Sequence, residues 1–198
     1  MTTVLELLAV AAIILLNAFF VAAEYALVTV RRTRMHELAH AGDRRARRVL
    51  KVTSQPPRFI AAMQLGVTLT SLAIGAVGEP ALEHVLDPWM ATVIAVFLGF
   101  LVITYFHVVI GELVPKGISL GSSEGVALRV AATVRAFFFV FRPLIWVLQR
   151  STEVVLHRLG LEPPGADIEV YSEPETTPVI FGQGACGVVV IWTAVPGS

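Results

Sequence analysis

The stretch WMATVIAVFLGFLVITYFHVVIGELVPKG, Trp89 to Gly117, is hydrocarbon along most of its length and then meets one carboxylate, Glu112. Its apolar run Trp89–Ile110 is long enough to cross a bilayer, which takes about 20 residues. Pro115 and Lys116 follow the carboxylate after about one helical turn. The pattern indicates a membrane-spanning helix whose carboxylate either marks the membrane surface or holds a cation.

Two other apolar segments, Leu7–Val30 and Phe59–Val77, are also of spanning length. Hydrophobic residues make up 56% of the chain and charged residues 15%, whereas a soluble domain carries about 25% charged residues. No Lys or Arg precedes the first segment, which favours a span over a cleaved signal peptide. The sequence therefore predicts an all-α membrane protein with three transmembrane helices, at about 7–30, 59–77 and 89–112.

The charges of the two loops orient these spans. The loop between the second and third spans holds Glu79, Glu83 and Asp87 and no basic residue. Basic residues are concentrated between the first two spans, which places that loop in the cytoplasm, the N-terminus outside and the C-terminal side inside. The basic residues of this loop are Arg31, Arg32, Arg34, Arg44, Arg45, Arg47, Arg48, Lys51 and Arg58.

The basic loop is predicted to fold as a short helical hairpin. It turns at Ala41-Gly42, and Asp43 is placed to cap the second helix. A basic stretch can contact nucleic acid, but next to two spans we interpret it as a solvated face against anionic lipid. The expected partner is the lipid bilayer, with no nucleic acid.

The segment Gly125–Gly160 is apolar but is interrupted by arginines and a proline. Arginine at the bilayer centre costs roughly 2.5–3.5 kcal/mol, and Arg135 and Arg142 fall on nearly the same side of a helix. We therefore expect a juxtamembrane helix at about 125–159 that lies along the interface. A fourth span at 125–149 is the alternative.

Polar residues within the spans form a second pattern. Gln64, Thr68 and Ser71 have the spacing i, i+4, i+7, which places them on one face of the second span. Such a stripe serves either interhelical hydrogen bonding or a transport path. Asn17 and Glu24 share a face of the first span, and Glu24 is equally consistent with an ion pair to the arginines that follow it. His107 is interpreted as a packed or hydrogen-bonded histidine.

Glu112 offers the strongest candidate for a cation ligand. Because Pro115 has no N–H, the carbonyl of Gly111 lacks its usual helical partner. A free carbonyl beside a carboxylate is an oxygen pair, and Mg²⁺ prefers oxygen ligands together with several waters. Side chains of the polar stripe would complete such a metal site, whereas plain helix termination is the alternative. The candidate ligands are Glu112, Gly111, Gln64, Thr68 and Ser71, with Glu24 as a further possibility.

Three stretches, taken together, resemble the transmembrane domain of the CNNM/CorC family: NAFFVAAEYALVTVRR (Asn17–Arg32), MQLGVTLTSLAIG (Met63–Gly75) and GELVPK (Gly111–Lys116). The family comprises magnesium transporters, labelled haemolysin-like in bacteria, and the resemblance covers residues 4–160. It implies a homodimer in the cell membrane, not an enzyme, that exports Mg²⁺ with Na⁺ as the driving ion. It also implies that Glu112 and the Gly111 carbonyl coordinate Mg²⁺.

The chain departs from the family pattern at several ligand positions. Val21, Ala22 and Ala23 stand where family members carry serines, and Gln64 and Thr68 stand where they carry asparagines. These positions therefore provide fewer strong oxygen ligands for a cation. A non-transporting membrane adaptor or a Mg²⁺ sensor is the alternative function.

Residues 161–198 are expected to form a linker and an atypical tail, without the CBS modules that follow the membrane domain in the family. GQGACG (Gly182–Gly187) matches the spacing of a dinucleotide fingerprint, which needs a helix after it. The residues that follow, VVVIW, are typical of a strand. No bound nucleotide is expected for this chain.

Overall fold

The computed structural model describes residues 2–86, 92–161, 168–171 and 188–191. The chain divides into two compact units, Met1–Gln149 and Arg150–Ser198, and α8 runs across the boundary between them. The helices are α1 (Thr2–Thr29), α2 (Arg32–His40), α3 (Arg44–Val52), α4 (Pro56–Leu86), α5 (Thr92–Phe106), the π-helical segment η2 (His107–Leu113), α6 (Val114–Gly121), α7 (Ser123–Val140) and α8 (Arg142–Arg158).

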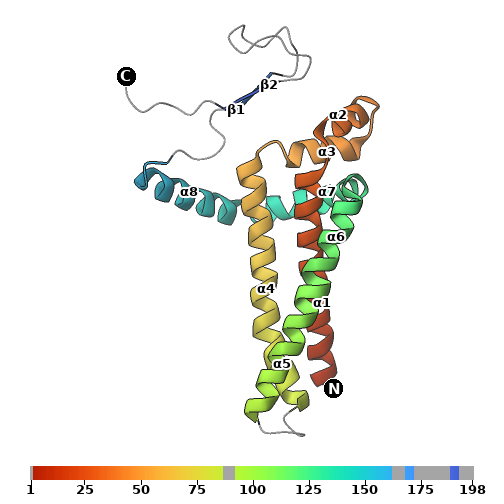
Figure 1. Ribbon diagram of the computed structural model, residues 1–198, viewed down its shortest axis with the longest axis vertical. Coiled ribbons are helices and arrows are strands. Elements are labelled where there is room, and N and C mark those ends of the chain that lie inside the picture. Colours follow the sequence, from red (N-terminus) through yellow and green to blue (C-terminus); the bar gives the residue numbers. More distant parts are fainter. Residues whose placement is uncertain (1, 87–91, 162–167, 172–187, 192–198) are drawn as a thin grey trace. The chain divides into compact units, whose positions relative to one another are not determined.

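Three helical segments are long and apolar enough to cross a membrane: Val4–Thr29, Pro56–Gly78 and Val96–Gly121. They confirm the three predicted spans. In Figure 1, α1 and α4 run side by side with the rod formed by α5, η2 and α6, and α1 packs against α4, η2 and α6. The side chains exposed on these helices are largely apolar, which suits contact with lipid. The direction in which the spans cross the membrane stays a prediction.

The third span extends beyond the expected end near Glu112, because α5, η2 and α6 form one continuous rod to Gly121. Pro115 does not stop the helix, since the turn before it is widened. In η2 the backbone bonds reach one residue further than in an α-helix, and the Val114 N–H donates to the Val109 carbonyl. Proline is tolerated just after this turn, in the first turn of α6.

The predicted hairpin of the basic loop is present as α2 and α3. Gly42 adopts φ +97° at the turn, a conformation that favours glycine, and the Asp43 carboxylate accepts from the Arg45 N–H at 2.6 Å. Ala46, Val49 and Val52 form the buried face of α3, which packs against α7. The arginines of α3 therefore face outward.

The juxtamembrane segment is helical, as expected, but it is not one helix. A break at Phe141 separates α7 from α8, and the two are bent by 77°. The Phe137 ring stacks on Phe141 with centroids 4.4 Å apart and meets Phe20 of α1 edge-on at 4.8 Å, so the bend is anchored in the core. If this bent pair is counted as one span, the described residues contain four candidate spans instead of three.

The second unit contains a small antiparallel sheet. Strand β1 (Ile168–Tyr171) pairs with β2 (Val188–Ile191), with Ile168 opposite Ile191. Strand β2 confirms the strand character expected of VVVIW. The glycine-rich motif Gly182–Gly187 lies outside the described residues.

Candidate functional site

One buried amide links the three spans. Asn17 lies in the middle of α1 and its residue surface is 1% exposed. Its Nδ2 donates to the Gly111 carbonyl of η2 at 3.1 Å, and its Oδ1 accepts from the Thr70 hydroxyl of α4 at 2.6 Å. The Gly111 carbonyl, whose usual α-helical donor Pro115 lacks, thus accepts from a side chain of another span.

A histidine and a serine complete this arrangement. The Nε2 atom of His107 lies 3.3 Å from Asn17 Nδ2 and 3.4 Å from the Ser71 hydroxyl, which is also 3.4 Å from Asn17 Oδ1. Because Asn17 Nδ2 can only donate, Nε2 is the accepting nitrogen of the imidazole. We call these residues the Asn17 cluster: Asn17, Thr70, Ser71, His107 and Gly111.

Glycine at position 111 is required by the closeness of the first and third spans. A Cβ atom there would lie 3.0 Å from Cδ2 of His107 and 3.3 Å from Nδ2 of Asn17. Both distances are shorter than ordinary contacts, so a larger residue would separate Asn17 from the carbonyl it binds. The small residue and the widened turn together bring the backbone of η2 to α1.

Glu112, the next residue, has different partners. Its carboxylate forms an ion pair with Lys116 one turn later, and the two side chains are 42% and 26% exposed. The Lys116 ammonium also lies 5.1 Å from the centre of the Tyr25 ring, within cation–π range. Lys116 therefore links the Glu112 carboxylate to an aromatic ring of α1.

The structure divides the residues predicted from the sequence into three groups. Ser71 and Gly111 belong to the Asn17 cluster, and Glu112 lies beside it in the chain. Glu24 is partly buried, and within the described residues it forms no ion pair with the arginines after α1. The side chains of Gln64 and Thr68 are on the exposed part of α4, away from the cluster, so the predicted stripe is split.

Three residues of the cluster were not among the predicted ligands: Asn17, Thr70 and His107. The signal for Asn17 was present, since it is the one amide within a long apolar helix and shares a face with Glu24. A buried amide in a span needs a partner, but its position along the chain does not say which. His107 is hydrogen-bonded, as expected.

The polar atoms of the Asn17 cluster, together with Glu112, provide only some of the ligands that a hard cation prefers. Among the residues that the structure describes, no three His, Cys, Asp or Glu side chains are grouped so as to hold a metal. The oxygens near one another are a carbonyl, an amide and two hydroxyls, with Glu112 as the adjacent charge. Mg²⁺ accepts such neutral oxygens when it keeps several waters.

The chain also matches a known protein family. The model of the Cyclin M transmembrane N-terminal domain, CNNM, matches residues 7–189. The chain belongs to the CNNM family. It is accordingly a multi-pass membrane domain of the cell membrane, as its composition predicted.

CNNM relatives occur in distant bacteria. The UPF0053 protein YhdT of Bacillus subtilis is 35% identical over 179 residues, which cover 86% of this chain and 39% of YhdT. The polyamine export protein of Haemophilus influenzae is 32% identical over 157 residues, covering 75% of this chain and 36% of that protein. The chain thus spans about two-fifths of the length of these relatives.

Proposed function

We propose that this CNNM domain transports a cation across the membrane past the Asn17 cluster and Glu112, with Mg²⁺ as the cargo. The observation that carries the proposal is that all three spans bring oxygen atoms to one buried place beside a carboxylate. Polar groups inside a membrane are costly and are typical of ion paths. The resemblance to magnesium transporters supports the same cargo.

Two of the candidate ligands are engaged within the protein. The Gly111 carbonyl accepts from Asn17 Nδ2, and the Glu112 carboxylate is paired with Lys116. A divalent cation reaches these oxygens only if it displaces the amide and the ammonium group. Entry of the ion would therefore be coupled to a change in the contact between α1 and η2, which is the kind of differential contact that alternating access requires.

A second cargo is favoured by one specific contact. The Lys116 side chain is a primary alkylammonium, and it lies against a carboxylate and over an aromatic ring. A protonated polyamine would need the same two partners. One relative is named a polyamine export protein, so polyamine is the alternative cargo for this chain.

Two further features belong to the proposal. Transport by a homodimer, with Na⁺ as the driving ion, follows from the family resemblance. A non-transporting adaptor or Mg²⁺ sensor would use the same residues to bind the ion without moving it. Flux is the property that distinguishes a transporter from either of these.

The test is flux in proteoliposomes made from the purified chain, with Mg²⁺ followed by an entrapped fluorescent indicator and spermidine followed by radiolabel. Glu112→Gln keeps the shape of the side chain and removes its charge. Since interactions with a charged group contribute about 1.5–3 kcal/mol, Mg²⁺ flux should fall by about ten-fold or more. Glu24→Gln should have a smaller effect.

Glu37→Gln is the matched control, because it removes an exposed carboxylate that pairs with Arg34 in the hairpin, away from the spans. Its flux should equal that of the unchanged chain. Spermidine flux without Mg²⁺ flux would select the polyamine alternative. Saturable Mg²⁺ binding with no flux of either ion would make the chain an adaptor or sensor and refute transport.

A further inference from the structure

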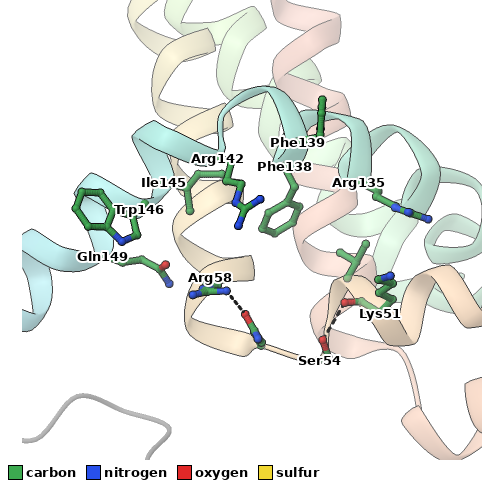
Figure 2. Close-up of a pocket in the computed structure, with 12 residues that line it drawn as sticks. Lys51, Ser54, Arg58, Arg135, Phe138, Phe139, Arg142, Ile145, Trp146 and Gln149 are labelled. Atoms are coloured by element: carbon green, nitrogen blue, oxygen red, sulfur yellow. Dashed lines mark hydrogen bonds between the residues drawn. The ribbon is translucent and has the colours of Figure 1, made fainter.

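A second polar region lies at the end of the spans where α4 begins, apart from the Asn17 cluster. A cavity of about 350 Å³ opens there between the end of α3, the start of α4 and the bend between α7 and α8. Figure 2 shows Arg142 reaching from the bend toward the side on which Arg58 lies, with Phe138 beside it and Trp146 further along α8. The cavity is lined by Lys51, Val52, Ser54, Gln55, Arg58, Arg135, Phe138, Phe139, Arg142, Ile145, Trp146 and Gln149.

The charge of this cavity is of one sign. Four basic residues line it, Lys51, Arg58, Arg135 and Arg142, and no lining residue is an acid. Within the described part of the chain none of the four has an ion pair with a carboxylate, and Arg58 donates only to the Gln55 amide oxygen at 2.7 Å. Like charges gathered without counter-charge repel one another, so the cavity attracts an anion.

The apolar residues that line the cavity indicate which class of anion it binds. Phe139 is 81% exposed and Trp146 is 61% exposed, on either side of the bend. The span of α4 starts at Pro56, so Arg58 lies at the depth where a membrane changes from headgroups to hydrocarbon. Tryptophan is enriched at that depth, and basic pockets beside spans bind lipid headgroups.

The position of these cations is fixed by the fold. Ile145 is buried at 4% exposure, and the Phe137–Phe141 stack holds the other side of the bend. Arg142 is the first residue of α8 and is therefore held over the cavity by packing on both sides. The exposed aromatic rings beside the cations lie at the level where α4 enters the membrane, which suits contact with the acyl chains of a lipid.

We propose that this cavity binds the phosphate of an anionic phospholipid, with Arg58 and Arg142 on the phosphate and the exposed aromatic residues of the bend along the acyl chains. The proposal does not depend on which ion the domain transports. It assigns to this chain a lipid site, distinct from general attraction between a basic loop and a charged membrane.

The test uses Trp146 as the reporter, with Trp89→Phe and Trp192→Phe removing the other tryptophans. The chain is reconstituted in phosphatidylcholine vesicles that contain either dibrominated phosphatidylglycerol or dibrominated phosphatidylcholine at the same mole fraction. Phosphatidylglycerol should quench Trp146 fluorescence several-fold more effectively. Arg58→Gln with Arg142→Gln should lower this preference to near one.

The matched control removes the same charge from outside the cavity. Arg44 and Arg48 are exposed on α3, and replacing both by Gln should leave the preference unchanged. Equal quenching by the two lipids in the unchanged chain, or equal loss in both double variants, would overturn the proposal in favour of general surface attraction. Relief of quenching by soluble glycerol 3-phosphate would show a free phosphoester site and overturn the lipid assignment.

The single variant Arg142→Gln keeps the test decisive if the double variant does not insert. Its side chain is exposed, and α8 has other residues that hold its first turn in place. Circular dichroism should give the same helical content as for the unchanged chain. The preference for phosphatidylglycerol should then fall between the values of the unchanged chain and the double variant, and an unaltered preference contradicts the site.

Discussion

Asn17 is the residue on which the polar contacts between the spans depend. It bonds Gly111 and Thr70 at once, whereas Thr70 also has the Gly66 carbonyl as an acceptor. Asn17→Leu keeps a similar volume and removes both interhelical bonds. Such bonds average about 0.6 kcal/mol in membrane proteins and reach about 1.7, so the free energy of unfolding should fall by about 1–2 kcal/mol.

The measurement for Asn17→Leu is unfolding by sodium dodecyl sulfate, followed by circular dichroism in mixed micelles. Gln64→Leu is the control, since Gln64 is exposed on α4 and lies outside the Asn17 cluster. An equal loss in both variants would mean that the amide of Asn17 contributes nothing beyond its volume.

Gly111 gives a second prediction at the scale of the residue. In Gly111→Ala the new methyl group would press on His107 and Asn17, at 3.0 and 3.3 Å, and the bond from Asn17 to the carbonyl should weaken. Overpacking of this kind costs about 1–3 kcal/mol. The midpoint of thermal unfolding in detergent should fall, together with the transport rate.

Gly117→Ala is its control on the same rod, because a Cβ atom there meets nothing within 4 Å. Alanine is the better helix former by up to about 1 kcal/mol, so this variant should be as stable as the unchanged chain or more so. Transport should be unaffected. If both variants behave alike, close contact at position 111 is not what requires glycine there.

The sequence identified part of the candidate site at this scale. Gly111 and Glu112 were predicted from the missing donor of Pro115 and from the carboxylate at the end of an apolar run. The role of Asn17 was not, because its partners lie 53 and 94 residues away along the chain. Contacts between spans depend on how helices rotate against each other, and a polar stripe such as Gln64, Thr68 and Ser71 leaves that rotation open.

Among the helices, α1 and α4 approach each other closely at Gly66. A Cβ atom at Gly66 would lie 2.5 Å from the Phe20 ring, and that ring is held on its other side by Phe137. Gly66→Ala should therefore push α4 away from α1 and destabilise the domain by about 1–3 kcal/mol. Thermal unfolding in detergent measures the loss.

Gly75→Ala in the same helix is the control, since its Cβ atom meets nothing within 4 Å. Its unfolding midpoint should stay the same or rise slightly. A stable Gly66→Ala variant would mean that the Phe20 ring can move aside and that the contact between α1 and α4 tolerates a methyl group.

The helices themselves followed from the sequence more closely than their ends did. Long apolar runs fix the three spans, and Asp43 with Gly42 fixes the hairpin between the first two. The third span continues beyond its predicted end because the widened turn of η2 accommodates Pro115. A proline considered on its own predicts the end of a helix. The break at Phe141 agrees with Pro143, which suits the first turn of a new helix.

For the whole molecule, the distribution of charge predicts which side each loop faces. A cysteine in place of Arg45 should be cytoplasmic, and one in place of Glu83, near the C-terminal end of α4, should be external. Both cysteine variants also carry the substitution Cys186→Ser, which removes the native thiol. A membrane-impermeant maleimide applied to intact cells should label position 83 alone.

Labelling after the cells are opened provides the control, because position 45 should then react as well. His157→Cys, in the last turn of α8, should follow position 45 if the C-terminal side is inside. External labelling at positions 45 and 157 would reverse the predicted orientation of every span.

The widened turn of η2 has a consequence for how this fold tolerates changes in length. It takes up one more residue than a regular helical turn, while α5 and α6 on either side continue in the same rod. A homologue with a single deletion between His107 and Leu113 would therefore keep the lipid-facing surfaces of both flanking helices and lose only the wide turn. A family member that lacks this one residue would keep the membrane-spanning helix. It would lose the contact between Asn17 and Gly111.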